Sequence, residues 1–501
     1  MFESAEIGHQ ISRKAYKEAE EKLRQALLEA QYQLLENKQR AVIVLINGVD
    51  GAGKGETVNL FNEWMDPRHI RTEAFATPEA SGEDAPMGRP AMWRFWQVLP
   101  PKGHVGILFG NWYTDPIVQH ALGHDKEARF DERLTDIRAF ERMLTAEGVR
   151  LVKLWFHMTK EGVAKRFKAL EKDPKTAWRV TAHDWDRLKH YGSFVPISSK
   201  ALRKTSTGEA PWLVIDGSDP NYRAITAGQY LLDNLLRAVQ PLAAPAGTGH
   251  AAPPPPPPLD GRSLLATQDY TRTLDRSTYE DQLERLQGRL NKLLRAPEWK
   301  RRSLVLVFEG MDAAGKGSTI RRITQALDAR HYRVIPVAAP NEAERAQPYL
   351  WRFWRYLPRW GHTTMFDRSW YGRVLVERVE GFCTEPDWTR AYDEINAFEE
   401  QMTQAGTVVV KFWLSITQEE QLKRFEARQN TPHKVHKITA DDWRNRDKWP
   451  LYARAVDDMM DRTSTDIAPW HIVASDDKRW SRIEVLRLLC ERLEAALGAK
   501  G

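Results

Sequence analysis

The sequence predicts an α/β fold: two tandem, doubly wound parallel-sheet domains joined by a proline-rich linker. The prediction rests on an internal repeat, on aliphatic strands that alternate with helices, and on the run of prolines at 253–258. Such a run adopts extended polyproline II and joins domains without packing into either. We therefore expect a first domain at residues 1–239, a linker at 240–262 and a second domain at 263–501.

The two halves of the chain repeat one another. GVDGAGKG begins at Gly48 and returns as GMDAAGKG at Gly310, a displacement of 262, and WRFW begins at Trp93 and returns at Trp351, a displacement of 258. One short length change therefore separates the matches. So many matches in order indicate duplication of a whole domain.

Each copy begins with a helix, an aliphatic strand, a glycine loop and a second helix. The first strands are expected at 42–46 and 304–308, and the run at 408–414 predicts a later strand followed by a charged helix. Strands and helices in this alternation favour a parallel sheet covered on both faces. Such sheets bind ligands at the carboxyl ends of their strands.

Composition narrows the class of protein. The 74 basic and 68 acidic residues leave a net charge of +6, too small to draw the whole chain onto nucleic acid. The two cysteines, Cys383 and Cys490, are too few for a disulfide framework. No signal peptide stands at the N-terminus, and the aliphatic runs are strand-sized. We expect a cytoplasmic protein with neither membrane nor nucleic acid as partner.

The glycine loop of the second copy predicts phosphate binding. It lies between a strand and a helix, the context in which a G-x-x-x-x-G-K sequence encloses phosphate with backbone N–H groups. The helix N-terminus and the Lys316 ammonium add positive charge. The expected phosphate-binding residues are Gly310, Ala313, Ala314, Gly315, Lys316, Gly317 and Ser318.

Two acids near this loop are candidates for metal binding. Gly317 follows the lysine, where a hydroxyl ligand of magnesium usually stands, and Ser318 comes one place later. Asp312 within the loop is therefore expected to bind Mg²⁺ or to orient the acceptor oxygen, although a turn-forming role stays open. The second acid, Asp367, ends a strand in the segment MFDRSWYGR at 365–373, where a second metal-binding aspartate is expected.

These motifs resemble the polyphosphate kinase 2 family. The marks of that family are a GxDxxGKG loop, an FDRSWY-type motif that runs into VERVEGF, and a lid rich in Arg and Lys; they stand here at Gly310, Phe366 and Lys423. The resemblance covers both halves. It implies P-loop kinase-like domains of the thymidylate-kinase type. It also implies Mg²⁺-dependent transfer of a phosphoryl group from inorganic polyphosphate to AMP, giving ADP.

The resemblance also implies roles for individual residues. Asp312 and Asp367 are expected to organise magnesium, and Lys316 to grip the transferred phosphate. Arg368 and Arg373 are expected to hold nucleotide phosphate, and Glu377 and Arg378 are further candidates for nucleotide binding. The lid is expected to include Arg424 and Arg428, one helical turn apart. A groove for polyphosphate is expected from Arg321, Arg322, Arg352, Arg355, Lys434 and Lys437.

Other interpretations remain open. An ATP-dependent nucleoside monophosphate kinase combines the same loop, Asp-Arg motif and arginine lid, and a polyphosphate kinase of the same family acting on ADP or GDP differs only in its acceptor. A non-catalytic polyphosphate-binding protein needs the loop alone. The aromatic residues Trp351, Phe353 and Trp354 are expected to pack in the core rather than to stack on a cofactor.

The first copy is expected to be catalytically silent. It retains Asp50 and Lys54, but it lacks the second acid and three cations. At the displacement of 258, the residues Asp367, Arg368, Arg373 and Arg428 correspond to Phe109, Gly110, Asp115 and Leu170. We expect the first domain to act as a scaffold in an intrachain pseudo-dimer.

Overall fold

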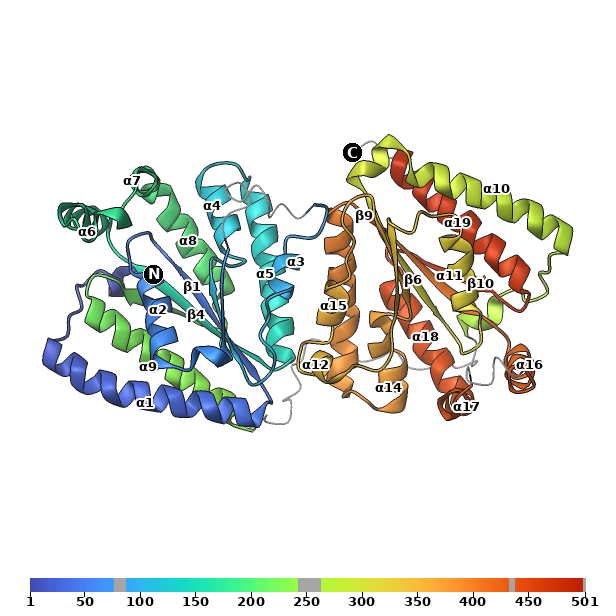
Figure 1. Cartoon of the computed structure of the whole chain (residues 1–501), viewed down its shortest axis with the longest axis horizontal. Helices are drawn as coiled ribbons and strands as arrows, with labels where there is room; N and C mark the ends of the chain where they lie inside the picture. Colours follow the sequence, from blue (N-terminus) through green and yellow to red (C-terminus); the bar gives the residue numbers. More distant parts are fainter. Residues whose placement is uncertain (76–86, 242–262, 432–437, 499–501) are drawn as a thin grey trace. The chain divides into compact units, whose positions relative to one another are not determined.

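The aliphatic runs of both copies become the central strands of parallel sheets. The computed structural model describes residues 1–75, 87–241, 263–431 and 438–498 (Figure 1). The described residues form two units: 1–75, 94–241 and 340–351 in the first, and 87–93, 263–339, 352–431 and 438–498 in the second. The predicted α/β class with tandem domains is confirmed. Residues 242–262 of the predicted linker lie outside the described residues.

Each unit contains one five-stranded, wholly parallel sheet with the same strand order. The first sheet runs β2 (Ile70–Ala74), β3 (Val105–Phe109), β1 (Ala41–Gly48), β4 (Val149–His157), β5 (Trp212–Asp216). The second runs β7 (Tyr332–Pro336), β8 (Thr363–Asp367), β6 (Ser303–Gly310), β9 (Thr407–Ser415), β10 (Trp470–Ala474). Strands β1 and β9 are buried along their whole length, which explains their unbroken apolar sequences.

Helices cover both faces of each sheet. Along the first half they are α1 (Arg13–Asn37), α2 (Lys54–Trp64), α3 (Trp93–Trp96), α4 (Thr114–Ala121), α5 (Glu127–Ala146), α6 (Lys160–Lys172), α7 (Ala182–Lys189), α8 (Tyr191–Thr205) and α9 (Pro220–Val239). In this unit, α1, α2 and α9 lie on one face and α4, α5 and α8 on the other (Figure 1).

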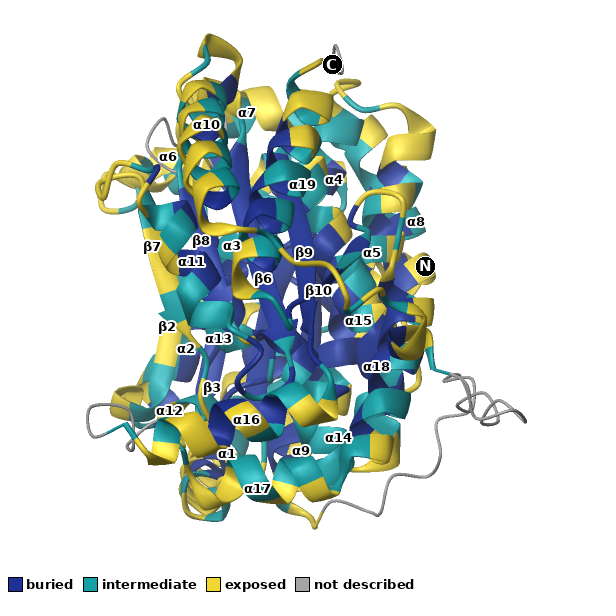
Figure 2. Ribbon diagram, turned by 90° about the vertical axis from the view of Figure 1, so that its right-hand side faces the viewer, coloured by how far each residue is buried: buried dark blue, intermediate teal, exposed yellow. Residues whose placement is uncertain are grey.

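Along the second half the helices are α10 (Arg276–Leu294), α11 (Lys316–Thr324), α12 (Glu342–Arg345), α13 (Trp351–Trp354), α14 (Val376–Glu380), α15 (Glu385–Gln404), α16 (Gln418–Gln429), α17 (Ala440–Asp447), α18 (Trp449–Thr463) and α19 (Lys478–Gly498). Helices α15 and α18 cover one face of the second sheet, and α10, α11 and α19 cover the other (Figure 1). The strands β6, β8 and β9 are buried, while the edge strand β7 and the outer faces of α10 and α16 are exposed (Figure 2).

Short 3₁₀ helices complete the described elements. They are η1 (Glu3–Ala5), η2 (Pro67–His69), η3 (Ala177–Arg179), η4 (Leu264–Thr267), η5 (Pro297–Arg301) and η6 (Trp370–Arg373). Phe353 and Trp354 of α13 are buried, and their rings pack on Trp370 and Phe398. The prediction of a core role for these two aromatic residues is confirmed.

A buried ion pair recurs in both units. Lys411 of β9 donates to Glu399 of α15 at 2.7 Å and to the Thr463 carbonyl at 2.7 Å, while Tyr371 donates to the same carboxylate at 2.7 Å. In the first unit Lys153 pairs with Glu141 at 2.8 Å in the corresponding place. Tyr371 lies only four residues after Asp367, so the network in the second unit also anchors the segment that carries the second acid.

Within the ranges that the structure describes, no helix is both long and apolar enough to cross a membrane.

Candidate active site

The glycine loop of the second unit connects β6 to α11 at the carboxyl edge of the sheet. Gly310 has a φ of 150°, and a Cβ placed on it would lie 2.4 Å from the Leu414 carbonyl oxygen, so only glycine fits there. Gly315, with a φ of 108°, is the N-cap of α11. The loop therefore leads directly into a helix N-terminus, as an anion site requires.

Two residues, one within the loop and one after the second acid, adopt a backbone conformation that side chains disfavour. Ala313 has a φ of 66° and Arg368, directly after Asp367, has a φ of 64°. The first copy has glycine at both places, Gly51 and Gly110, where a positive φ causes no strain. Strain retained at two neighbouring points in one copy is typical of a functional site.

Lys316 folds back over the loop. Its Nζ donates to the Gly310 carbonyl at 2.6 Å and to the Met311 carbonyl at 3.3 Å. Burial and the nearby charge of Arg368 lower the pKa of the Lys316 ammonium, and the acids Asp312, Asp367 and Glu309 partly offset this effect. Among the described residues the ammonium bonds only to carbonyl oxygens, so it can turn to a phosphate without breaking an ion pair there.

Asp312 is held by three separate segments. Its Oδ1 accepts a hydrogen bond from Arg368 at 2.8 Å and its Oδ2 accepts one from Asn445 of α17 at 2.8 Å. Gln421 of α16 donates to its backbone carbonyl at 3.0 Å. Asn445 and Gln421 could not be predicted from the sequence, because an amide on an ordinary helix carries no motif.

Asp367 lies at the end of β8, next to the central strand. It is paired with Phe308 of β6, and a Cβ on Gly317 would lie 3.7 Å from its Oδ2. The carboxylate is thus at the first turn of α11. In the described part of the chain it makes neither a hydrogen bond nor an ion pair, and so it is free to bind a ligand.

The acids fit a magnesium ion that is shared with a phosphate. Mg²⁺ usually binds one or two carboxylates together with substrate phosphates and water. Asp312 and Asp367 flank Lys316 and can supply such oxygens. No group of three or more His, Cys, Asp or Glu side chains suited to a metal occurs among the described residues, so an all-protein metal cage is not the arrangement found there.

Arg424 supports the loop from behind. Its guanidinium, with the side chain only 5% exposed, donates to the Ala313 carbonyl at 2.9 Å, to the Asp476 carbonyl at 2.8 Å and to Glu420 at 2.7 Å. The other predicted lid arginine, Arg428, is half-buried one turn further along α16. The structure therefore places the Arg424 guanidinium against the loop, where it donates to backbone carbonyl oxygens.

The other predicted cations lie in different surroundings. Arg373 pairs with Glu377 at 2.8 Å, and Arg378 pairs with Asp458 at 2.7 Å. Arg321 and Arg355 are exposed, Arg322 donates to the Tyr279 hydroxyl at 3.2 Å, and Arg352 donates to the Ala338 carbonyl at 2.7 Å. Lys434 and Lys437 lie outside the described residues.

Glu309 is a further acid beside the loop, and no sequence motif marks it. It precedes Gly310 and is buried, and its Oε1 accepts a hydrogen bond from Ser369 at 2.8 Å. Burial raises the pKa of the Glu309 carboxyl. The first copy has the amides Asn47 and Asn111 in these places, joined at 3.1 Å. The difference between Glu309 and Asn47 in the two copies is the sequence feature that could have indicated this acid.

The loop of the first unit is neutralised internally. Lys54 forms an ion pair with Asp50 at 2.9 Å, and Arg187 lies 3.3 Å from the same carboxylate. Glu56, in the place of Ser318, accepts hydrogen bonds from Arg166 and Arg223. A phosphate that entered this loop would have to displace these contacts and would meet the Glu56 carboxylate.

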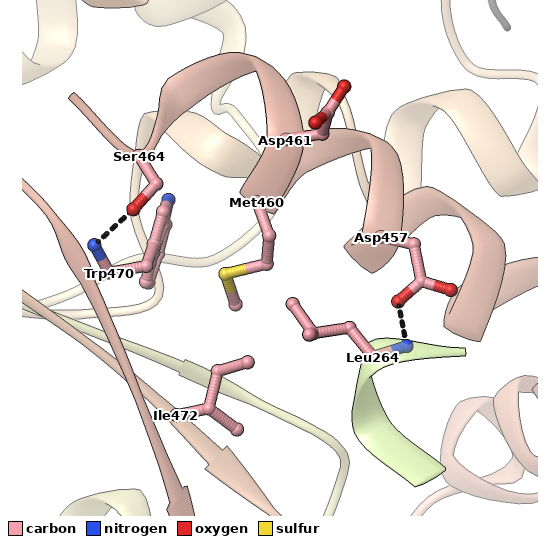
Figure 3. Close-up of a pocket in the computed structure, with 7 residues that line it drawn as sticks. All are labelled: Leu264, Asp457, Met460, Asp461, Ser464, Trp470 and Ile472. Carbon is pink, nitrogen blue, oxygen red and sulfur yellow. Dashed lines mark hydrogen bonds between the residues drawn. The ribbon is translucent and has the colours of Figure 1, made fainter. Parts of the chain in front are cut away.

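A separate hollow of about 410 Å³ lies among η4, α18 and β10 (Figure 3). Met460, Trp470 and Ile472 give it apolar walls, and Asp457 and Asp461 lie at its edge. Burial raises the pKa of the Asp457 carboxyl, whose oxygen accepts the Leu264 N–H at 3.0 Å. Acids at the edge and apolar walls make this hollow unsuitable for a phosphate.

The fold and the site define a phosphate-binding α/β protein with the glycine loop, lysine and paired acids of a phosphotransferase. The chain belongs to the polyphosphate kinase 2 family, whose sequence model matches residues 10–241 and 273–500. Both copies therefore derive from the same family domain.

Individual relatives resemble the chain over its whole length. It is 52% identical to the polyphosphate:AMP phosphotransferase of Pseudomonas aeruginosa and 50% identical to that of Pseudomonas syringae, over 99% of this chain and of each relative. A crystal structure of a polyphosphate kinase 2 from Pseudomonas aeruginosa PA01 matches with a TM-score of 0.89 and 49% identity, covering 100% of both chains.

Proposed function

We propose that the chain is a polyphosphate:AMP phosphotransferase whose reaction takes place in the second unit. The observation that carries the proposal is the convergence of Asp312, Lys316, Asp367 and Arg368 at one glycine loop. The names of the full-length relatives support the same donor and acceptor. The free thiols of Cys383 and Cys490 suit a reducing compartment, so we place the reaction in the cytoplasm.

In the proposed reaction an oxygen of the AMP phosphate attacks the terminal phosphorus of polyphosphate. A new P–O bond forms, the bond to the rest of the chain breaks, and the shortened polyphosphate leaves with that electron pair. Catalysis then consists of alignment and of neutralising charge on the transferred phosphoryl group. Lys316 and the loop N–H groups hold that group, and Arg368 supplies a second positive charge beside it.

Magnesium would neutralise charge on the reacting phosphates. Asp367 is the better-placed ligand because its carboxylate has no competing bond in the described chain, whereas Asp312 would exchange one of its partners, Arg368 or Asn445. We expect excess EDTA to stop the reaction and added Mg²⁺ to restore it. Undiminished turnover in EDTA would contradict the assigned roles of both acids.

The acceptor and the donor are tested together. The purified chain is incubated with Mg²⁺ and either polyphosphate without ATP or ATP without polyphosphate, and AMP, ADP, GMP and GDP are compared as acceptors. We expect ADP from AMP at the highest rate. Activity only with ATP as donor would favour a nucleoside monophosphate kinase. A higher rate with ADP or GDP than with AMP would show that AMP is not the preferred acceptor. Binding of polyphosphate without turnover would indicate a non-catalytic protein.

A further inference from the structure

The amide of Asn445 on α17 is oriented by a neighbouring helix. Its NH₂ group donates to Asp312 Oδ2 at 2.8 Å, and an ionised carboxylate only accepts hydrogen bonds, so the amide oxygen must face away from the acid. That oxygen lies 3.2 Å from the hydroxyl of Tyr452 on α18. The hydroxyl can donate to it, so Tyr452 favours the amide orientation in which the NH₂ group faces Asp312.

The Tyr452 hydroxyl is itself held in a buried place. Tyr452 is 8% exposed, and its hydroxyl also lies 3.4 Å from Oε1 of Glu380 on α14. Burial and the charges of Glu380 and Asp312 raise the pKa of Tyr452. The phenol therefore keeps its proton, and that proton lies between two acceptors, of which Asn445 is the nearer.

Glu380 also holds the end of the helix that carries Asn445. Its carboxylate, 4% exposed, accepts a hydrogen bond from Lys448 at 2.8 Å and pairs with Arg444 at 3.0 Å. Arg444 and Lys448 lie on either side of Asn445 in the sequence, where α17 ends and α18 begins. One buried acid thus fixes this helix end through two cations. The residues that we call the Glu380 network are Glu380, Arg444, Asn445, Lys448 and Tyr452.

The two partners of the Asp312 carboxylate differ in how firmly they are held. Arg368, on Oδ1, has a side chain that is 49% exposed. Asn445, on Oδ2, is bonded on its other side to Tyr452. A half-exposed guanidinium exchanges a carboxylate for a phosphate more readily than an amide breaks two hydrogen bonds. Oδ1 is therefore the oxygen that Asp312 can offer to a metal ion.

The first copy has none of the side chains of the Glu380 network. At the displacement of 258, the residues Glu380, Arg444, Asn445, Lys448 and Tyr452 correspond to Leu122, Asp186, Arg187, His190 and Phe194. Arg187 lies 3.3 Å from the loop acid Asp50. The first copy thus holds its loop acid with a cation, whereas the second uses a neutral amide at this place. A neutral partner orients a carboxylate and leaves its charge for a metal ion.

We propose that the Glu380 network positions Asp312 for magnesium: Asn445 keeps its bond to Oδ2 while Arg368 leaves Oδ1 to the metal ion. Tyr452 and Glu380 are positioning residues, because they act on Asp312 through Asn445. This inference rests on the proposed function. It has a direction that can be measured. Removal of the Asn445 amide weakens metal binding if the amide orients Asp312, and strengthens metal binding if the amide competes for it.

The first experiment measures metal binding directly, with Mn²⁺ in place of Mg²⁺ because both prefer oxygen ligands. Free Mn²⁺ is followed by electron paramagnetic resonance during titration of the full-length chain, and the relevant site is the one that is lost in Asp312→Ala. We expect Asn445→Ala to raise the Kd of this site about tenfold, and Tyr452→Phe and Glu380→Gln to raise it several-fold, as for other partners of metal ligands. A lower or unchanged Kd in Asn445→Ala, or no site lost in Asp312→Ala, would overturn the proposal.

Initial rates provide a second measurement that separates positioning from folding. Tyr452→Phe and Glu380→Gln should raise the Mg²⁺ concentration for half-maximal rate several-fold, while kcat at saturating Mg²⁺ stays within about threefold of wild type. A rate lowered equally at every Mg²⁺ concentration would indicate a structural role and overturn the proposal. The matched control is Tyr230→Phe, which also removes a half-buried hydroxyl, there bonded to the Pro211 carbonyl at 3.4 Å. It should keep the wild-type Mg²⁺ dependence.

A double variant tests whether Tyr452 acts through Asn445. If it does, Asn445→Ala combined with Tyr452→Phe should bind Mn²⁺ no more weakly than Asn445→Ala alone. Effects that add would overturn the assignment of Tyr452. Asn445→Arg introduces the residue that the first copy has at this place, and it should raise the Kd at least as much as Asn445→Ala, because a cation neutralises Asp312.

The two kinds of measurement keep this proposal distinct from the proposed function. A wild-type chain that makes no ADP would refute the proposed function, and the Mn²⁺ titration, which needs no turnover, would still decide whether Asn445 positions Asp312. An active wild type with an unchanged Kd and an unchanged Mg²⁺ dependence in the folded Asn445→Ala variant would overturn the network proposal alone.

Discussion

At the scale of single residues, the two copies differ where the chemistry of the loop depends on charge and conformation. Asp312 pairs with Arg368 in the second copy, and within the described part of the chain Lys316 bonds only to carbonyl oxygens. In the first copy Lys54 pairs with Asp50 itself. Arg368 therefore occupies the Asp312 carboxylate, so that the Lys316 ammonium is available to bind a phosphate.

The first prediction concerns the unpaired acid. Asp367→Asn keeps the size of the side chain but removes its charge, so it should lower kcat by about 100-fold or more, which is roughly 2.7 kcal/mol. It should also raise the Mg²⁺ concentration needed for half-maximal rate. The measurement is a magnesium titration of initial rates, with thermal unfolding to confirm the fold. A near-normal rate of the Asp367→Asn variant at low Mg²⁺ would show that Asp367 is not a magnesium ligand.

The second prediction concerns the strained loop. Ala313→Gly removes the side chain from a residue with a φ of 66°, so it should raise the free energy of unfolding by up to about 1 kcal/mol. The opposite change, Gly315→Ala, places a side chain at a φ of 108° and should lower the free energy of unfolding. Urea unfolding measures both. A less stable Ala313→Gly variant would show that the packing of the methyl group outweighs the strain.

Sequence alone predicted the parts of the site that lie in continuous motifs. The loop from Gly310 and the acid Asp367 belong to contiguous segments, so a local pattern was enough. The pairing of Asp312 with Asn445 joins residues 133 positions apart, and no local pattern contains it. Arg424 was identified as a cation, but its contacts with loop and strand-end carbonyls depend on the packing of α16.

At the scale of elements, the buried lysine–glutamate pair joins the helical layer to a central strand in both units. Lys411 and Lys153 are both fully buried, and each also donates to the carbonyl of a threonine at a helix end. The lysine–glutamate pair is also present in the first copy, which lacks the second acid, so we attribute the pair to the fold and not to the chemistry at the loop.

The third prediction follows from this repetition. Lys411→Met and Lys153→Met each leave a buried glutamate without its partner, so each should lower the free energy of unfolding by about 3–5 kcal/mol. Lys411→Met should also reduce turnover, because Glu399 anchors Trp370 and Tyr371 beside the catalytic segment. Lys153→Met should keep its turnover at temperatures where the chain stays folded. Urea unfolding and initial rates on the same samples test both statements.

At the scale of the whole molecule, duplication explains why two similar sheets occur in one chain. The strand order is the same in both units, so the first copy kept the complete fold. Its loop has acquired internal ion pairs through Glu56, Arg166 and Arg223. The sequence predicts a catalytically silent first copy from Phe109 and Gly110. The ion pairs of Glu56 could not be predicted, because they depend on the folded arrangement of α2, α6 and α9.

The central claim is that one of the two loops performs the reaction. It is tested most directly by Lys54→Ala and Lys316→Ala in the full-length chain, assayed for ADP formed from AMP and polyphosphate without ATP. We expect near-normal turnover for Lys54→Ala, because that lysine is already paired with Asp50, and a loss of about 100-fold or more for Lys316→Ala. Two half-active variants, or loss only in Lys54→Ala, would contradict the account.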